Sequence, residues 1–341
     1  MKQFLLIILL ATTATLVSCE KILDYTTTQI DYNGVPHKSM LVVSARYYCD
    51  LGLKIHVDRS LSIAENPNLP PLTQVKVTLT KKGGATLFSN LVTLGSTSGK
   101  AFISKDSLIE LPTEGETLIL SVECNGFDPV EGETTIPQTV PINNFSVTGN
   151  KSKSSTFQFT LNFNDPANST NYYFISSVEH TFAYPTWNND TTHNIQRITI
   201  PLTDPIFSFM PDFRTSIHEP FNNSIYKPRI FPDTPISGKS YSLKIDIPEK
   251  TDYQQTLYDT IETEYTIELF SISKELFEAY KSIYLAEIIA GDIYSEPITL
   301  YSNMSNGIGF FGSVSPRASK TIRLEKNRVL DVFNGYTDFH Y

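Results

Sequence analysis

The stretch Phe157-Gln158-Phe159-Thr160-Leu161-Asn162-Phe163 is the clearest secondary-structure signal in the chain. Large apolar side chains occupy every second position, and polar side chains lie between them. Successive side chains of a strand point to opposite faces, so this alternation predicts a strand with one buried face and one solvated face. Asp165-Pro166 ends the run, and we expect residues 171–175 to begin its hairpin partner.

Other runs with the same period extend in both directions from this strand. They cover residues 41–49, 75–80, 118–124, 241–247 and 265–269. Turn-forming residues such as Lys82-Gly83-Gly84 separate them, which is typical of β-sandwiches. The sequence therefore predicts a mainly β protein.

Pro137 and Pro141 bracket the expected boundary between two domains. We expect an immunoglobulin- or transthyretin-like β-sandwich over residues 35–138 and a β-rich C-terminal domain over residues 139–341. One segment of the second domain breaks the strand pattern. Residues 273–289 carry an apolar stripe at helical spacing, and Ser273 is a suitable N-cap, so a helix is predicted there.

Composition limits the classes of partner. The 341 residues are 40% hydrophobic, 12% aromatic and 18% charged, a balance that favours β-structure over disorder. The formal net charge of -9 argues against nucleic acid as a partner.

The first nineteen residues resemble a bacterial lipoprotein signal. Lys2 precedes a short apolar core at residues 4–10, and Leu16-Val17-Ser18-Cys19 fits the lipobox pattern that ends in an obligatory cysteine. We expect residues 1–18 to be removed, Cys19 to be acylated and inserted into a lipid bilayer, and residues 19–34 to form a tether. The alternative is an ordinary secretory signal with a chance cysteine.

Two further cysteines, Cys49 and Cys124, lie at core-facing positions of predicted strands. An exported protein can oxidise such a pair, and a disulfide would close a loop of about 75 residues. Two buried thiols that act as small hydrophobic groups are an equal alternative.

No motif in the sequence indicates a reaction. Residues 95–100 resemble a phosphate-binding loop but are one residue short, and the six histidines lack the spacing of metal ligands. No nucleophile elbow, Cys-x-x-Cys pair or calcium loop is present. We expect no catalytic residue, no metal and no cofactor, and catalysis is unsupported rather than excluded.

A Pro- and aromatic-rich stretch at residues 207–236 is the best candidate for a binding loop. Its candidate contact residues are Phe207, Phe209, Phe213, Phe221 and Tyr226. Exposed rings there would suit a sugar, a peptide or a protein surface. The alternative is that these rings fill the core of the second domain.

Residues 295–303, Ser-Glu-Pro-Ile-Thr-Leu-Tyr-Ser-Asn, are followed by Asn306-Gly307-Ile308-Gly309-Phe310-Phe311-Gly312. This pattern resembles the C-terminal signature of domain-of-unknown-function family 4249. Further resemblances are Asn164-Asp165-Pro166, Asn171-Tyr172-Tyr173 and Gly238-Lys239-Ser240-Tyr241. The three glycines of the signature suit a tight loop with its backbone close to a neighbour, which is either a partner or the protein's own core.

The resemblance implies a lipoprotein of Bacteroidetes, lipid-anchored in the outer membrane and displayed on the cell surface. It also implies an accessory role beside a TonB-dependent receptor in nutrient uptake, and it supplies no catalytic residues. Three function classes follow. The leading one is a non-catalytic ligand-binding or receptor-docking lipoprotein, and the alternatives are a surface adhesin or fimbrial subunit and an exported hydrolase.

Overall fold

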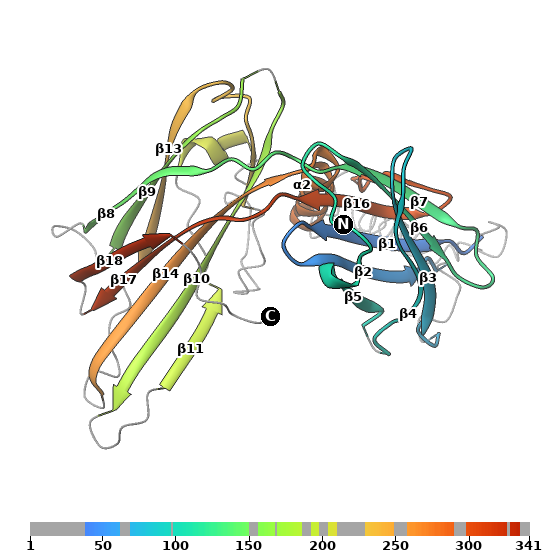
Figure 1. Cartoon of the computed structure of the whole chain (residues 1–341), viewed down its shortest axis with the longest axis horizontal. Helices are drawn as coiled ribbons and strands as arrows, with labels where there is room; N and C mark the ends of the chain where they lie inside the picture. Colours follow the sequence, from blue (N-terminus) through green and yellow to red (C-terminus); the bar gives the residue numbers. More distant parts are fainter. Residues whose placement is uncertain are drawn as a thin grey trace, which may run out of the picture. The chain divides into compact units, whose positions relative to one another are not determined.

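The computed structural model describes residues 38–61, 69–96, 98–149, 156–167, 169–185, 192–197, 204–209, 229–248, 258–289, 298–325 and 328–334. Strands dominate this part of the chain, and α2 (Lys274–Ile289) is its one α-helix, so the predicted mainly β fold is confirmed. The strands and the helix described below belong to one compact unit, residues 40–59 and 70–341 (Figure 1). No helix within the described residues is both long and apolar enough to span a membrane.

The first β-sandwich pairs two antiparallel layers around one core. One layer has the order β16 (Ile308–Val314), β1 (Leu41–Tyr48), β2 (Gly52–Arg59) and β5 (Lys100–Ser104). The other has the order β15 (Met304–Ser305), β7 (Val130–Thr135), β6 (Thr117–Glu123), β3 (Gln74–Lys81) and β4 (Thr86–Thr93). A short 3-10 turn, η3 (Lys105–Ser107), follows β5. Within the first layer, β16 and β1 are the exception, because they run parallel to each other.

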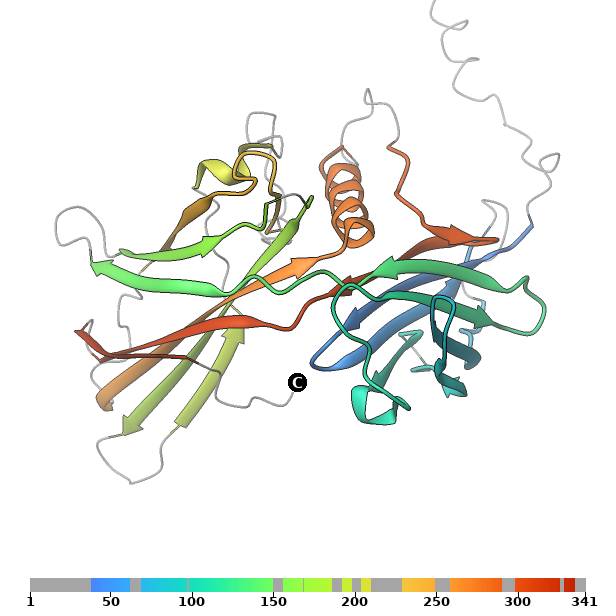
Figure 2. The same cartoon turned by 45° about the horizontal axis from the view of Figure 1, so that its top comes forward.

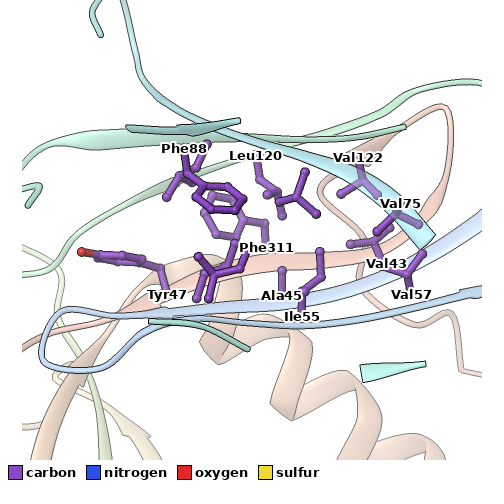
Figure 3. Packing of buried hydrophobic residues seen from close by; sticks show 14 of the residues in the cluster. Val43, Ala45, Tyr47, Ile55, Val57, Val75, Phe88, Leu120, Val122 and Phe311 are labelled. Carbon is purple, nitrogen blue, oxygen red and sulfur yellow. The ribbon is translucent and has the colours of Figure 1, made fainter. Parts of the chain in front are cut away.

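Alternating side chains of these strands form the first core. Tyr47, Leu120 and Phe311 are fully buried and come from three different strands. Figure 3 shows Tyr47, Phe88 and Phe311 among the side chains that point into the space between the layers. Burial of such side chains removes apolar area from water at about 25 cal/mol per Å², the main stabilising contribution to the sandwich.

Strand β16 joins this sandwich from a distant part of the sequence. It pairs with β1 in parallel register, Val43 opposite Gly309 and Ala45 opposite Phe311. Gly309 has a φ of +119°, and a Cβ added there would lie 1.9 Å from the carbonyl oxygen of Val43. Only glycine allows the two backbones to approach in this way. The first sandwich is therefore not continuous in sequence, since residues 304–314 from the predicted second domain complete it.

The second sandwich has its own core. Its smaller sheet has the order β13 (Ser240–Pro248), β9 (Thr156–Asn164) and β8 (Ile142–Gly149). A larger sheet packs on the other side of this core. Its strands in this part of the chain are β10 (Tyr172–Pro185), β11 (Thr192–Arg197), β12 (Ile230–Pro232), β14 (Tyr258–Ile272), β17 (Ala318–Glu325) and β18 (Arg328–Asn334). The 3-10 helix η4 (Pro205–Phe209) packs against the same core. Figure 1 shows β10 beside β14, with which it forms the longest pairing among the described strands.

The pairing of the predicted strand β9 differs from expectation. β9 lies between β8 and β13, and β10 pairs with β14 instead. The hairpin predicted between residues 157–163 and 171–175 is therefore wrong. The chain crosses from one sheet to the other between β9 and β10, and the Asp165 carboxylate in this connection accepts hydrogen bonds that are described below.

Helix α2 begins as predicted. The Ser273 hydroxyl accepts a hydrogen bond from the backbone N–H of Leu276 at 3.3 Å, which is an N-cap geometry. The same hydroxyl accepts from the N–H of Ser313 at 3.2 Å, so the helix start is tied to β16. A Cβ added at Gly312 would lie 2.6 Å from the Cβ of Leu276. The helix thus packs directly on the β16 backbone, and Figure 2 shows it in orange over that strand.

Candidate functional site

The structure places one of the predicted loop aromatics firmly in a core. Phe207 is 6% exposed, and its ring meets that of Phe231 edge-to-face at 5.5 Å between centroids. For Phe207 the core alternative holds, and its assignment as a binding contact is corrected. Phe209 is the last residue of η4, and its side chain is outside the described set. Phe213, Phe221 and Tyr226 also lie outside the described residues, so for them the binding-loop hypothesis stays a prediction.

A buried carboxylate fixes the start of this aromatic stretch. Asp204 is 6% exposed and accepts hydrogen bonds from the backbone N–H of Ile206 and of Lys244, both at 2.9 Å. The Tyr241 hydroxyl also donates to Asp204. Burial, followed by this hydrogen bond, raises the pKa of Tyr241, so the phenol stays protonated and donating. Asp204 thereby attaches the η4 turn to strand β13.

A second carboxylate fixes the far end of the stretch. The Asp233 side chain accepts from the backbone N–H of Asn171 at 2.7 Å, and the backbone N–H of Asp233 donates to the carbonyl of Asn171 at 2.9 Å. Burial raises the pKa of Asp233, and the negative charge of Asp165 acts in the same direction. This reciprocal pair holds β12 beside the start of β10.

Asp165 connects the two loops. It is 5% exposed and accepts from the backbone N–H of Gly238 at 2.9 Å, from the Asn171 side-chain amide at 3.4 Å, and from the Tyr173 hydroxyl. Burial, and then the bond to Asp165, raises the pKa of Tyr173, which therefore remains a donor. A carboxylate without such donors would be costly to bury. We call Asp165, Asp204 and Asp233 with their partners the loop-base network.

The loop-base network unites three sequence stretches that carry the family resemblance. Residues 164–166 supply Asp165, residues 171–173 supply Asn171 and Tyr173, and residues 238–241 supply the Gly238 donor and the Tyr241 hydroxyl. The first two stretches are neighbours in sequence, whereas residues 238–241 lie much further along the chain and meet them in space. The carboxylates of the network accept hydrogen bonds from loop residues and thereby fix the positions of those loops.

The C-terminal signature also serves the protein's own framework. The added Cβ positions at Gly307 and Gly309 would collide with Leu41 O or Val43 O, and the one at Gly312 would collide with Leu276. The glycine backbone was expected to approach either a partner or the protein's own core. The structure shows that it approaches the protein's own core.

The two cysteines are free thiols at opposite ends of the first sandwich. Cys49 directly follows the last residue of β1. Cys124 lies near Arg59, because the charge of Arg59 acts on the Cys124 thiol. Arg59 in turn pairs with Leu41, the first residue of β1. The length of β1 between these ends is roughly 23 Å, whereas a disulfide needs Cα atoms within about 7 Å. The alternative of two free thiols is thus the one the structure shows. The alternation in sequence predicts which face of the sheet each cysteine is on, but it does not predict how far apart the two cysteines are along the strands.

The remaining sequence-predicted site is the lipidation residue. Cys19 lies outside the described residues, so its acylation stays a prediction. Within the described ranges, no group of three or more His, Cys, Asp and Glu side chains lies close enough to hold a metal ion.

Comparison with known proteins gives a family. The family model described as "Domain of unknown function (DUF4249)" matches residues 26–320. No curated protein matches the chain. Among solved structures, the chain is similar to the "tetra-tandem repeat in extending region of large adhesion protein", with 11% identity, a TM-score of 0.20 and coverage of 86% of this chain. The chain spans 50% of the length of that structure. The family match covers most of the chain, and the chain therefore belongs to the family of unknown function DUF4249.

Proposed function

We propose that this chain is a lipid-anchored accessory protein of the outer membrane that binds a ligand or docks on a TonB-dependent receptor in nutrient uptake. The loop-base network is the observation that supports a binding role best. It fixes residues 204–209 and 229–236 to the second core, so the segment between them leaves from two ordered ends. Binding sites are commonly built on loops that a rigid scaffold positions.

The buried acidic groups of the network support a role in positioning rather than in proton transfer. Each of the three carboxylates accepts at least one backbone N–H, and two accept a tyrosine hydroxyl. A general base must lie within hydrogen-bond reach of its substrate, and these carboxylates are only 3–6% exposed. The lipobox at Cys19 supplies the anchor in this proposal, since acyl chains contribute about 0.8 kcal/mol per buried CH₂.

The geometry of β16 favours this proposal over a fimbrial subunit. Fimbrial assembly by strand exchange needs a strand that one copy can release to the next. The strand beside β1 is the chain's own β16, and Gly309 and Gly312 fit it closely to Val43 and Leu276.

The test is purification of the tagged protein from native outer membranes, followed by identification of the proteins that copurify in stoichiometric amount. We expect a receptor barrel. Cys19→Ala should abolish membrane attachment and copurification together, whereas Ser18→Ala, which keeps a small residue before the cysteine, should leave both unchanged. Copurification of a self-polymer ladder, or membrane attachment of Cys19→Ala, would contradict the proposal.

A further inference from the structure

The outer face of the first sandwich carries an arginine in an uncommon setting. Arg46 is at the solvent-side parity of β1, opposite Gly312 on one neighbouring strand and Lys54 on the other. Its guanidinium carbon lies 5.4 Å from the ring centroid of Tyr280 and 5.2 Å from that of Phe310. The two rings are 6.4 Å apart and inclined by 70°, so they form a corner in which the guanidinium rests.

The Nε atom of Arg46 has no partner among the described residues. Its Nε is buried without a hydrogen-bond acceptor, and no carboxylate in the described part of the chain forms an ion pair with it. Aromatic contacts stabilise a guanidinium through its faces, but they leave its N–H donors unsatisfied. A buried donor without an acceptor is costly, which is the reason to look for an external acceptor.

Three lysines of the opposite layer are arranged differently. Lys76 on β3 is 2.9 Å from Glu123, and Lys81 at the end of the same strand is 2.7 Å from Glu110. Lys82, in the following turn, is 2.7 Å from Glu133. These three lysines are thus ion-paired, whereas the contacts of the Arg46 guanidinium within the described residues are with two aromatic rings.

Two lysines lie on the strands that follow Arg46 in the same layer. Lys54 lies directly across from Arg46, with its ammonium 5.1 Å from the centroid of the Tyr48 ring. Lys100 is on the next strand of the same layer, opposite His56 and two residues from Phe102, the residue opposite Lys54. Arg46 and Lys54 thus place two positively charged side chains at directly opposite register positions.

We propose that Arg46 is the anchor of a site for an oxyanion, a phosphate or carboxylate group of a ligand, on the outer face of β1 and β2. The planar guanidinium presents paired N–H donors that match the oxygens of such a group. The two rings hold the guanidinium in one orientation, which reduces the freedom lost on binding. This inference names a ligand chemistry for the accessory role proposed above and rests on that role only for its biological setting.

Calorimetric titration of the full lipidated chain in neutral detergent at low ionic strength tests the site. The probes are inorganic phosphate and citrate, with micelles containing phosphatidylglycerol as a separate arm. We expect saturable binding, weakened on the order of tenfold or more in Arg46→Gln, because a charged hydrogen-bond donor is lost. Lys76→Gln is the matched control, which removes a paired cation from the opposite layer and should leave binding unchanged. Binding of free phosphate identifies a soluble ligand, and binding to the anionic micelles alone identifies a lipid headgroup.

Three results would overturn the inference. One is equal binding by Arg46→Gln and the unmodified chain with both variants folded, as judged by unchanged denaturation midpoints. Another is the absence of saturable binding to any of the three probes. The third is an equal loss of binding in Lys76→Gln, which would show that net charge rather than Arg46 governs the interaction. Receptor copurification is measured separately, so failure of the titration leaves the proposed function standing, and the reverse also holds.

Discussion

The side chain of Asn303 replaces a strand neighbour for Phe311. Its Oδ1 accepts from the backbone N–H of Phe311 at 2.9 Å, and its Nδ2 donates to the carbonyl of Phe311 at 2.9 Å. The same Nδ2 donates to the carbonyl of Glu133 at 2.8 Å. A single amide thus satisfies both backbone groups of a fully buried residue and ties β16 to β7.

Asn303→Ala should destabilise the first sandwich by about 1–3 kcal/mol, since it leaves buried backbone groups of Phe311 without partners. Urea denaturation at constant m would measure the loss. Asn90→Ala, an exposed asparagine on β4, should change the free energy of unfolding by about 0.5 kcal/mol or less. Equal effects of the two substitutions would show that the Asn303 amide bonds contribute nothing specific.

Phe207→Ala should lower stability by about 3–5 kcal/mol, because the ring is in the second core and its removal leaves a cavity. Phe102→Ala is the matched control, since that ring is 54% exposed on β5 and should change the free energy of unfolding by about 0.5 kcal/mol or less. Thermal midpoints of the three proteins provide the measurement. A Phe207→Ala protein that is as stable as the parent would return this residue to the binding-loop candidates.

The strands were predictable from sequence because their signal is local. The alternation in residues 157–163 gave β9, and Ser273 followed by an apolar stripe gave α2. The pairing of strands was not predictable in the same way. The partners of β9 and the parallel pairing of β16 with β1 depend on tertiary contacts that a local pattern does not encode. The paired residues of β1 and β16 are more than a hundred positions apart in sequence.

The loop-base network was not foreseen, although a signal for it exists. Asp165 and Asp204 each precede a proline, and Asp233 follows one. Aspartate beside proline is typical of turns, in which a carboxylate accepts nearby backbone N–H groups. Composition alone gave the aromatic stretch, but it does not distinguish a core ring such as Phe207 from an exposed one.

Both cysteines should be alkylated after denaturation without reductant, since the structure has them as free thiols. In the native protein, modification of Cys49 by iodoacetamide near pH 8 should be very slow. Burial, with the charges of Asp50 and Glu114, raises the pKa of its thiol to about 12, and the thiolate is the reactive form. Intact mass spectrometry counts the adducts. A denatured, unreduced chain in which neither Cys49 nor Cys124 is modified would restore the disulfide.

Asp233 should make stability depend on pH in the opposite sense from an ion-paired carboxylate. Its pKa is raised on folding by burial, so between the ordinary aspartate value of about 3.9 and that raised value the folded chain holds a proton that the unfolded chain has released. Its contribution to the free energy of unfolding therefore decreases as pH rises through this window. Above the raised value the penalty is complete and constant.

Asp233→Asn removes this titration while its amide oxygen can still accept from the N–H of Asn171. The variant should therefore gain stability relative to the parent as pH rises from about 3 towards about 7, measured as the difference in free energy of unfolding from urea titrations at each pH. Glu131→Gln, which removes an exposed carboxyl from β7, is the control and should show a flat difference. A flat difference for Asp233→Asn as well would mean that the buried carboxyl keeps its ordinary affinity for protons. The donors of the loop-base network would then offset the full cost of its burial.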